Sequence, residues 1–260
     1  MHKWYLTVAI GVLVALAGCQ AGAEPQSIAE IKESGQAYLE SGEYDKAISE
    51  LESAINQAAD DSDAHFLLGQ AYNQAGQLEK AADEFRKGLE LNPESAAAHH
   101  NLGVTYYQLQ DLQSAIDEFN TALEIDPDDP DSHYQLGATY LTLALSGSAS
   151  TATVDAELLD QATEEFSAAL ELREDMPEAL IGLGNVYIQQ GDYEPAIETL
   201  QQAIESVPDS REAHYGLAGA YAQSGNIDEA CETYKRFLTL DPPASWRAQA
   251  EQTMAALACE

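Results

Sequence analysis

The stretch "LLGQAYNQAGQLEKAADEF", residues 67–85, contains two short apolar-periodic segments on either side of the polar turn "QAGQ". Apolar residues that return every three to four positions predict amphipathic helices, and a short polar turn predicts that the two helices are antiparallel neighbours. Four positions stand out: Gly69, Tyr72, Ala81 and Phe85. The small residues allow the paired helices to approach closely, and the aromatic rings fill the space beside them.

The same pattern recurs along the chain with a fixed period. Glycine returns at 69, 103, 137 and 184, with tyrosine three residues later each time, so the spacings are 34, 34 and 47 residues. Gly35 with Tyr38 and Ala218 with Tyr221 extend the pattern to six copies. The matching alanines are Ala47, Ala81, Ala115, Ala162, Ala196 and Ala230, and the large residues that follow them are Leu51, Phe85, Phe119, Phe166, Leu200 and Tyr234.

A proline near the end of several copies, at 93, 127, 208 and 242, completes a pattern that resembles the tetratricopeptide repeat. The resemblance implies an all-α fold, a right-handed superhelical α-solenoid of six helix pairs plus a C-terminal capping helix. One pair cannot bury its apolar face alone, so stability comes from stacking on neighbours. The expected repeats are 28–61, 62–95, 96–129, 130–176, 177–210 and 211–244, with the capping helix at 245–260.

The fourth repeat carries 13 extra residues between Tyr140 and Ala162. Its middle, "SGSASTATV" (146–154), predicts a flexible loop, and "DAELLDQATEEF" predicts a lengthened second helix with Asp155 as its cap. Two interpretations stay open for this insertion. It is either a tolerated insertion at a turn or a binding element.

The charge balance of the chain is strongly acidic, with 45 Asp and Glu against 11 Lys and Arg. Phosphate binding depends on Lys and Arg, so nucleic acid is excluded as a partner. The excess acid serves either solubility in a salty medium or attraction of a basic partner.

The N-terminus predicts export. Lys3 precedes the apolar run "WYLTVAIGVLVALAG", which is too short for a confident membrane span. "LAGC" (16–19) resembles the lipobox of bacterial lipoproteins. The resemblance implies a signal peptide at 1–18, acyl chains on Cys19 and a tether at 19–27. It also implies attachment to the cell envelope, at the periplasmic face of the outer membrane if the envelope has two membranes. An ordinary signal peptide with a chance cysteine is the alternative.

Two further cysteines, Cys231 and Cys259, are candidates for a disulfide. If the capping helix runs antiparallel to the helix that contains Cys231, its C-terminal end, which carries Cys259, returns to the level of Cys231. Export from the cytoplasm permits the two thiols to oxidise to a disulfide. A nucleophilic cysteine is less favoured, because no histidine falls near the repeat position of Cys231.

The histidines give no catalytic or metal-binding pattern. Repeat position 4, counted from the first residue of each repeat, is occupied by His65, His99, His133 and His214, and this recurrence indicates a packing role. Successive histidines are one whole repeat apart, which is too far for them to bind one zinc ion together. No HExxH, CxxC, GxSxG or phosphate-loop pattern is present. We therefore expect no enzyme, no metal and no cofactor.

A mixed aromatic, aliphatic and amide stripe falls on the first-helix face that lines the concave groove in the resembled family. Exposed aromatic residues in a row favour binding of an extended or helical peptide over a merely solvated surface. The predicted groove residues are Phe66, Gln70, Asn73, His100, Val104, Tyr107, Tyr134, Ile181, Asn185 and Tyr215. Lys32 is the one basic residue at these positions, so a clamp for a terminal carboxylate is not expected in this groove.

Together these features predict a non-enzymatic, membrane-anchored adaptor that binds a protein or peptide, with no small-molecule substrate. Its architecture resembles lipoproteins that assist type IV pilus and secretin assembly. An adaptor for peptidoglycan-remodelling enzymes is an alternative in the same class. A metal-binding or enzymatic envelope protein that uses acidic rows and His100 is the alternative from another class, and a self-associating solenoid is a third.

Overall fold

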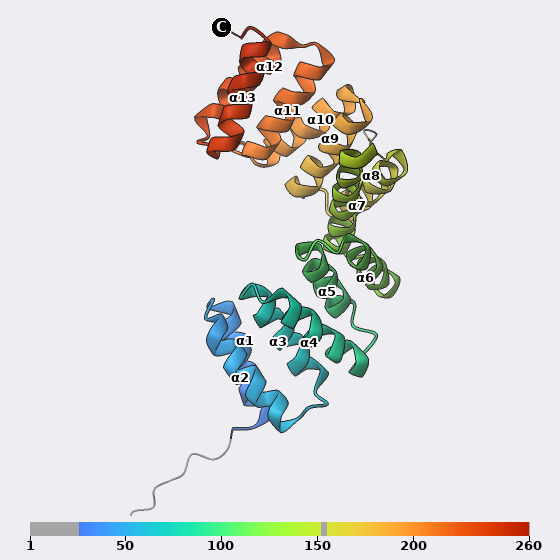
Figure 1. Cartoon of the computed structure of the whole chain (residues 1–260), viewed down its shortest axis with the longest axis vertical. Helices are drawn as coiled ribbons and strands as arrows, with labels where there is room; N and C mark the ends of the chain where they lie inside the picture. The colour runs from blue at the N-terminus through green and yellow to red at the C-terminus, as the bar shows by residue number, and fades with distance from the viewer. Residues whose placement is uncertain (1–25, 152–154, 260) are drawn as a thin grey trace, which may run out of the picture.

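The computed structural model of the protein describes residues 26–151 and 155–259, without the side chains of 147–151. The described residues form thirteen α-helices, arranged as six successive antiparallel pairs and one last helix (Figure 1). The helices follow one another from α1 and α2 at one end to α12 and α13 at the other. The expected all-α solenoid of repeated helix pairs is confirmed.

The odd-numbered helices from α1 to α11 are the first helices of the six pairs, and each begins at the first residue of a repeat. These first helices are α1 (Ile28–Glu40), α3 (Ser62–Gln74), α5 (Ala96–Gln108), α7 (Pro130–Thr151), α9 (Pro177–Gln190) and α11 (Arg211–Ser224). The second helices are α2 (Tyr44–Gln57), α4 (Leu78–Leu91), α6 (Leu112–Ile125), α8 (Ala156–Leu172), α10 (Tyr193–Ser206) and α12 (Ile227–Thr239). The last helix is α13 (Ala244–Ala256).

Local sequence signals set where the helices begin and end. Ser27 forms a capping box with Glu30 at α1, and Asp61 and Ser95 accept hydrogen bonds from backbone N–H groups in the first turns of α3 and α5. Gly191 ends α9 at φ 85°, in the left-handed region that a side chain would disfavour. The boundaries therefore follow from side chains within each repeat.

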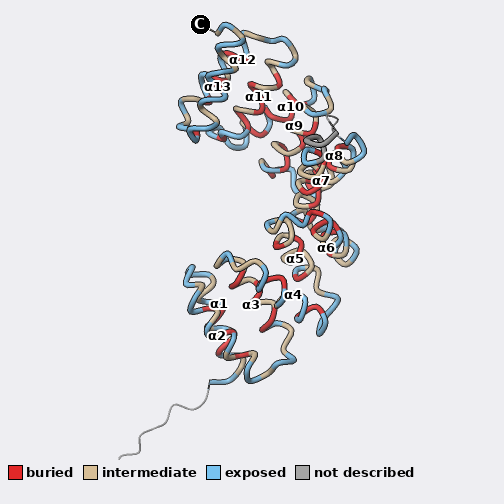
Figure 2. Tube along the Cα trace, viewed as in Figure 1, coloured by how far each residue is buried: buried red, intermediate tan, exposed pale blue. Residues whose placement is uncertain are grey.

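The interior is built by a glycine on the first helix of a pair facing a large side chain on the second. A Cβ atom added to Gly69 would lie 2.8 Å from the ring of Phe85, and one added to Gly103 would lie 2.7 Å from the ring of Phe119. Both rings are at most 1% exposed. Buried residues line the contacts between successive helices along the whole solenoid (Figure 2). The core is thus a series of clusters between neighbours, as expected of a stacked repeat.

The first helices line the concave side of the solenoid. Helix α3 contacts α1 and α5, and the same neighbour contacts continue through α7, α9 and α11. The second helices pack mainly on the helices directly before and after them in the chain. Because the first helices approach one another more closely, the stack curves around them.

The insertion in the fourth repeat differs from the prediction. Helix α7 continues to Thr151, so residues 146–151 are helical where we expected a flexible loop; 152–154 lie outside the described residues. This segment contains no proline, and Ser146 Oγ donates to the carbonyl of Thr142 at 2.8 Å, the i to i−4 contact typical of serine within a helix. Asp155 caps α8 as predicted, since its side chain accepts from the N–H groups of Glu157 and Leu158. The extra residues therefore lengthen both helices of the pair.

Helix α13 seals the last repeat. Trp246 and the buried Ala250 pack against α11 and α12 in one cluster. Among the described helices, none is both long enough and apolar enough to span a bilayer. The apolar run that precedes Cys19 lies outside the described residues.

Candidate functional site: the concave groove

A pocket of about 400 Å³ opens on the concave side where α1, α3 and α5 meet. It brings together three predicted groove residues, Gln70, Asn73 and Val104. Asn101 also lines it, although the sequence analysis did not single it out; it lies one turn of helix before Val104. Phe85 lies beneath the pocket, where its buried ring packs closely on Gly69, and Leu39 and Val104 supply the apolar surface. The pocket therefore combines an apolar floor with amide groups around it.

A neighbouring pocket of about 480 Å³ lies over α1 and α3 and includes Phe66 and Lys32. The ring of Phe66 lies directly over Gly88, since a Cβ atom there would be 2.2 Å from Cε1. The Lys32 ammonium contacts Asp61 at 2.8 Å and Asp63 at 3.6 Å. The one basic residue predicted in the groove is thus already neutralised by two carboxylates.

Two predicted groove residues link successive first helices. The amide nitrogen of Asn73 donates to Thr105 Oγ1 at 3.0 Å and to Gln108 Oε1 at 3.1 Å. The Tyr107 hydroxyl lies 3.1 Å from Thr142 Oγ1 on α7. These contacts position the repeats relative to one another, so both residues shape the groove as well as line it.

His100 lies half-buried at the junction of α5 and α7 instead of pointing freely into the groove. Its Nδ1 is 2.8 Å from Ser132 Oγ, and the Ser132 hydroxyl donates to Asp129 at 2.5 Å. Since that hydroxyl proton is committed to Asp129, Nδ1–H is the donor in the first contact. Burial lowers the pKa of His100 and outweighs the opposing effect of Asp129 and Asp131.

This His, Ser and Asp combination is a helix cap and not a catalytic site. Asp129 also accepts from the Ser132 N–H at 3.1 Å, which is the geometry of a cap at the start of α7. Ser132 is 1% exposed, so its hydroxyl cannot reach a substrate. Within the described residues, no group of three His, Cys, Asp or Glu side chains is arranged to hold a metal ion.

The C-terminal half of the predicted stripe is more closely packed than the N-terminal half. Tyr134 packs on Phe166 with ring centroids 6.0 Å apart, and burial raises its pKa. Ile181 packs between α9, α10 and α11, and Asn185 packs against Gly216. Tyr215 packs on Trp246 of the capping helix at 5.3 Å, and burial raises its pKa as well. The concave pockets described above therefore lie on the first three pairs.

The histidines at repeat position 4 form a recurring packing contact. Nδ1 of His65, His99 and His133 lies 2.7, 2.6 and 2.6 Å from Glu84, Glu118 and Glu165 respectively. In each case Nε2 donates to a carbonyl oxygen near the end of the preceding repeat, those of Ala59, Pro93 and Pro127. Nε2 uses its own hydrogen to donate to the carbonyl. The contact between Nδ1 and the carboxylate therefore contains a second proton, which lies between the ring and the carboxylate. The pairing of His at position 4 with Glu at position 23 is visible in the sequence and was missed.

Cys231 and Cys259 are joined in a disulfide that links α12 to the residues after α13. Their Cα atoms are 5.5 Å apart, within the usual range for a bridged pair. The bridge ties the capping helix to the last repeat at its far end. Cys19, the predicted lipidation site, lies outside the described residues.

Comparison with known families agrees with this repeat structure. Models of the tetratricopeptide repeat match residues 35–76, 69–110 and 105–143, and a second such model matches 149–201 and 181–245. The chain belongs to the tetratricopeptide repeat proteins, a class of protein-interaction scaffolds. A comparison with curated proteins finds no match.

Several solved structures share the fold at low sequence identity. YrrB, described as a tetratricopeptide repeat protein with an unusual peptide-binding site, is 23% identical with a TM-score of 0.62, covering 78% of this chain and 97% of that one. PilF of Pseudomonas aeruginosa is 19% identical with a TM-score of 0.70, covering 86% and 97%. A repeat protein of Parabacteroides merdae is 19% identical with a TM-score of 0.71, covering 89% and 87%.

Proposed function

We propose that this protein is a membrane-tethered adaptor of the bacterial cell envelope that binds a segment of a partner protein in its concave groove. The observation that carries the proposal is the pocket of about 400 Å³ between α1, α3 and α5. Three successive first helices contribute to it, so an extended segment that crosses them contacts three repeats at once.

The chemistry of the pocket suits a segment with one apolar anchor. Leu39 and Val104 offer apolar surface, and the amides of Gln70, Asn73 and Asn101 lie beside it. Amide groups donate and accept, so they match the N–H and C=O groups of an extended backbone. Glu40 at the edge of the pocket adds a preference for a basic residue next to the anchor.

The tether sets how the groove meets its partner. If acyl chains are attached at Cys19, residues 20–27 separate the membrane from the start of α1 at Ile28. Eight extended residues reach at most about 26–29 Å. The first repeats, which hold the concave pockets, are then the part of the solenoid closest to the membrane. The proposed partner is therefore a membrane-proximal protein of the envelope.

Type IV pilus or secretin assembly is the pathway we propose for this adaptor. The lipobox and the six repeats support it, and the fold shared with PilF agrees with it in length and architecture. Recruitment of peptidoglycan-remodelling enzymes is the second pathway to test. An identified partner distinguishes the two.

Photo-crosslinking in the native envelope tests the groove. A photoreactive residue at Val104 lies in the pocket, and one at Leu91, 45% exposed on α4, is the matched control. We expect a discrete crosslinked partner from position 104 that is absent from position 91 and is lost in a Gln70→Glu, Asn101→Glu variant of unchanged helicity. Equal crosslinking from both positions would contradict binding in the groove.

The anchor needs a separate experiment. Labelling of growing cells with an alkyne fatty acid should mark the natural protein and leave the Cys19→Ser variant unlabelled. The variant should also move from the membrane fraction to the soluble fraction. Labelling that persists in Cys19→Ser would refute the lipid anchor and leave the groove unaffected.

A further inference from the structure

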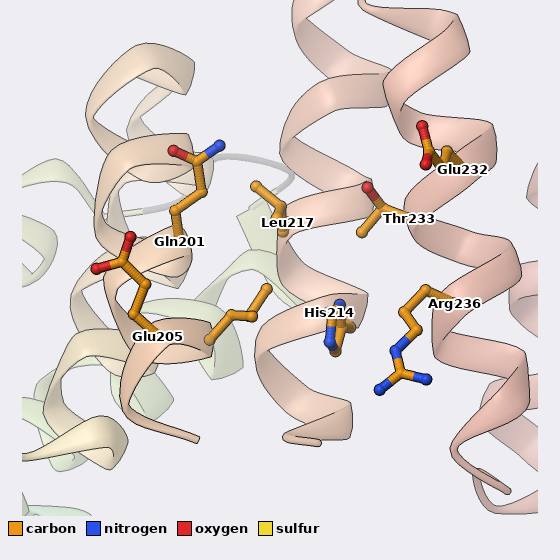
Figure 3. A pocket seen from close by; sticks show the side chains of 8 residues that line it. Gln201, Glu205, His214, Leu217, Glu232, Thr233 and Arg236 are labelled. Atoms are coloured by element: carbon orange, nitrogen blue, oxygen red, sulfur yellow. The ribbon is translucent and has the colours of Figure 1, made fainter. Parts of the chain in front are cut away.

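A third pocket, of about 530 Å³, lies on the side of the solenoid opposite the concave groove. It is formed between α10 and α12, with α11 at its base, and shares no lining residue with the pocket of the proposed function. Figure 3 shows its lining, which is Gln201, Ile204, Glu205, His214, Leu217, Glu232, Thr233 and Arg236.

The pocket exists because the sixth repeat lacks a side chain that three earlier repeats have. Repeat position 23 holds Glu84, Glu118 and Glu165 where position 4 holds histidine. In the sixth repeat position 4 is His214, but position 23 is Thr233. The threonine is shorter, and its Oγ1 donates to the carbonyl of Glu229 at 2.7 Å instead of meeting the ring. The space of the glutamate is therefore left open.

His214 is left with an unsatisfied nitrogen as a result. The residue is 8% exposed, and Nε2 donates to the carbonyl of Pro208 at 3.0 Å, as in the other three repeats. Its Nδ1 exposes less than 1 Å² and has no hydrogen-bond partner among the described residues. A buried polar atom without a partner is destabilising, so a group that supplies the missing hydrogen bond is favoured at this site.

The pocket is lined by one cationic side chain, Arg236, and by two carboxylates, Glu205 and Glu232. Figure 3 shows Arg236 next to His214 at one end of the pocket, Glu232 at the other end and Glu205 across the pocket on α10. Arg236 donates to Asp209 at 2.7 Å and to Thr239 at 3.3 Å. A guanidinium has five N–H donors, so it retains donors for a further acceptor.

We propose that this pocket is a carboxylate-binding site in which a bound carboxylate occupies the space that glutamate fills in repeats two to four. One carboxylate oxygen meets Nδ1 of His214 and the other meets Arg236. A proton is taken up with the ligand and lies between the ring and the carboxylate, as in the three intact pairs. Because Nδ1 exposes less than 1 Å², binding includes a local side-chain movement that uncovers this atom.

The carboxylate has two sources, a free small carboxylate or an acidic side chain of a protein segment. Acetate probes the first, and the blocked tripeptide acetyl-Gly-Glu-Gly-amide probes the second. Sodium chloride at equal ionic strength controls for charge screening. The readout is the long-range ¹H–¹⁵N spectrum of the histidine side chains in the full mature chain, in which His214 is assigned by its loss in His214→Leu.

We expect the Nδ1 signal of His214 to move from the position of a bare acceptor towards that of a protonated nitrogen, in a saturable way. Response to acetate alone, to the peptide alone or to both supports the site and identifies the source. The Thr233→Glu variant should show the shifted signal without ligand, respond to neither probe and unfold at a higher temperature. Thr233→Gln should fill the pocket without a charge and also abolish the response.

The proposal is overturned if neither probe moves the His214 signal beyond the chloride control. It is equally overturned if Thr233→Glu and Thr233→Gln respond as the natural protein does. Circular dichroism of both variants verifies that the helices are intact. The groove experiments use other residues, so failure of one proposal leaves the other standing.

Discussion

Removal of the Glu84 carboxylate tests whether the position 4 histidines hold the repeats together. His65 is the most buried of the three paired histidines, with side-chain exposures of 6% for the ring and 13% for Glu84. Its Nδ1 lies 2.7 Å from the carboxylate, and its Nε2 donates to the carbonyl of Ala59 at 3.2 Å. One side chain thus connects the end of the first repeat to both helices of the second.

The expected loss follows from this burial. In Glu84→Ala, Nδ1 loses its partner in a place that water hardly reaches, which costs about 1–3 kcal/mol. Lys87 also loses its contact with Glu84, but it is more than half exposed, so this adds less than about 1 kcal/mol. For a chain of this size, 2 kcal/mol lowers the melting temperature by roughly 4–8 °C.

Two control variants distinguish the cost of leaving Nδ1 without a hydrogen-bond partner from the cost of losing the carboxylate charge. Glu84→Gln keeps the length of the side chain and can donate its amide N–H to Nδ1, so we expect a loss of less than about 1 kcal/mol. The fifth repeat supplies the second control, because it carries Leu180 at position 4 and Thr199 at position 23. His65→Leu with Glu84→Thr imitates that repeat, and we expect it to be more stable than Glu84→Ala.

The assay is urea unfolding and thermal unfolding of the full chain, followed by circular dichroism. The single variants His65→Leu and Glu84→Thr form, with their double variant, a cycle that isolates the coupling between the two residues. The reasoning is refuted if Glu84→Ala leaves both midpoints unchanged. It is also refuted if the Leu and Thr double variant is as unstable as Glu84→Ala, because the loss would then come from packing alone.

Four further predictions concern other parts of the molecule. Cys259→Ser should lower stability by about 3–4 kcal/mol, the chain-entropy value for a loop of this length, and a reductant should reproduce the loss in the natural protein but not in the variant. Gly182→Ala should destabilise by about 1–3 kcal/mol, because its Cβ would lie 2.4 Å from the buried ring of Phe166. Gly219→Ala, whose Cβ would come no closer than 4.0 Å to a neighbour, should be neutral or stabilising by up to about 1 kcal/mol in the same melting assay. His100 should titrate below pH 6.5 by NMR, because burial lowers its pKa. Its contribution to stability is then complete above pH 6.5 and declines as the pH falls, since the unfolded chain takes up the proton first; a midpoint above 6.5 would contradict this.

The repeat architecture could be predicted from the sequence because its signals are local and recur. Gly69 and Phe85 lie within one repeat, and so do the residues that cap and end its helices. A contact that repeats six times at one spacing is visible without any knowledge of the fold. The packing role of His65, His99 and His133 followed from the same register, although the glutamate partners were overlooked.

The groove could be predicted only in part, because its open surface depends on contacts between repeats. Gln70, Asn73 and Val104 line a pocket, as their register suggested. Tyr215 shares the register of Phe66 but packs against Trp246, which arrives from the capping helix 31 residues later. No periodic pattern within a repeat encodes that contact.

The sequence alone determined the class of fold, the number of repeats and the residues that face one another within each pair, since all of these follow from periodicity and side-chain size. The tertiary structure decided which side chains remain open to a partner. His100 is the clearest case: its position on the helix predicted a groove residue, but Ser132 and Asp129 of the next repeat engage it. Stacking brings residues 32 positions apart into hydrogen-bond distance, and only the three-dimensional packing shows which of them meet.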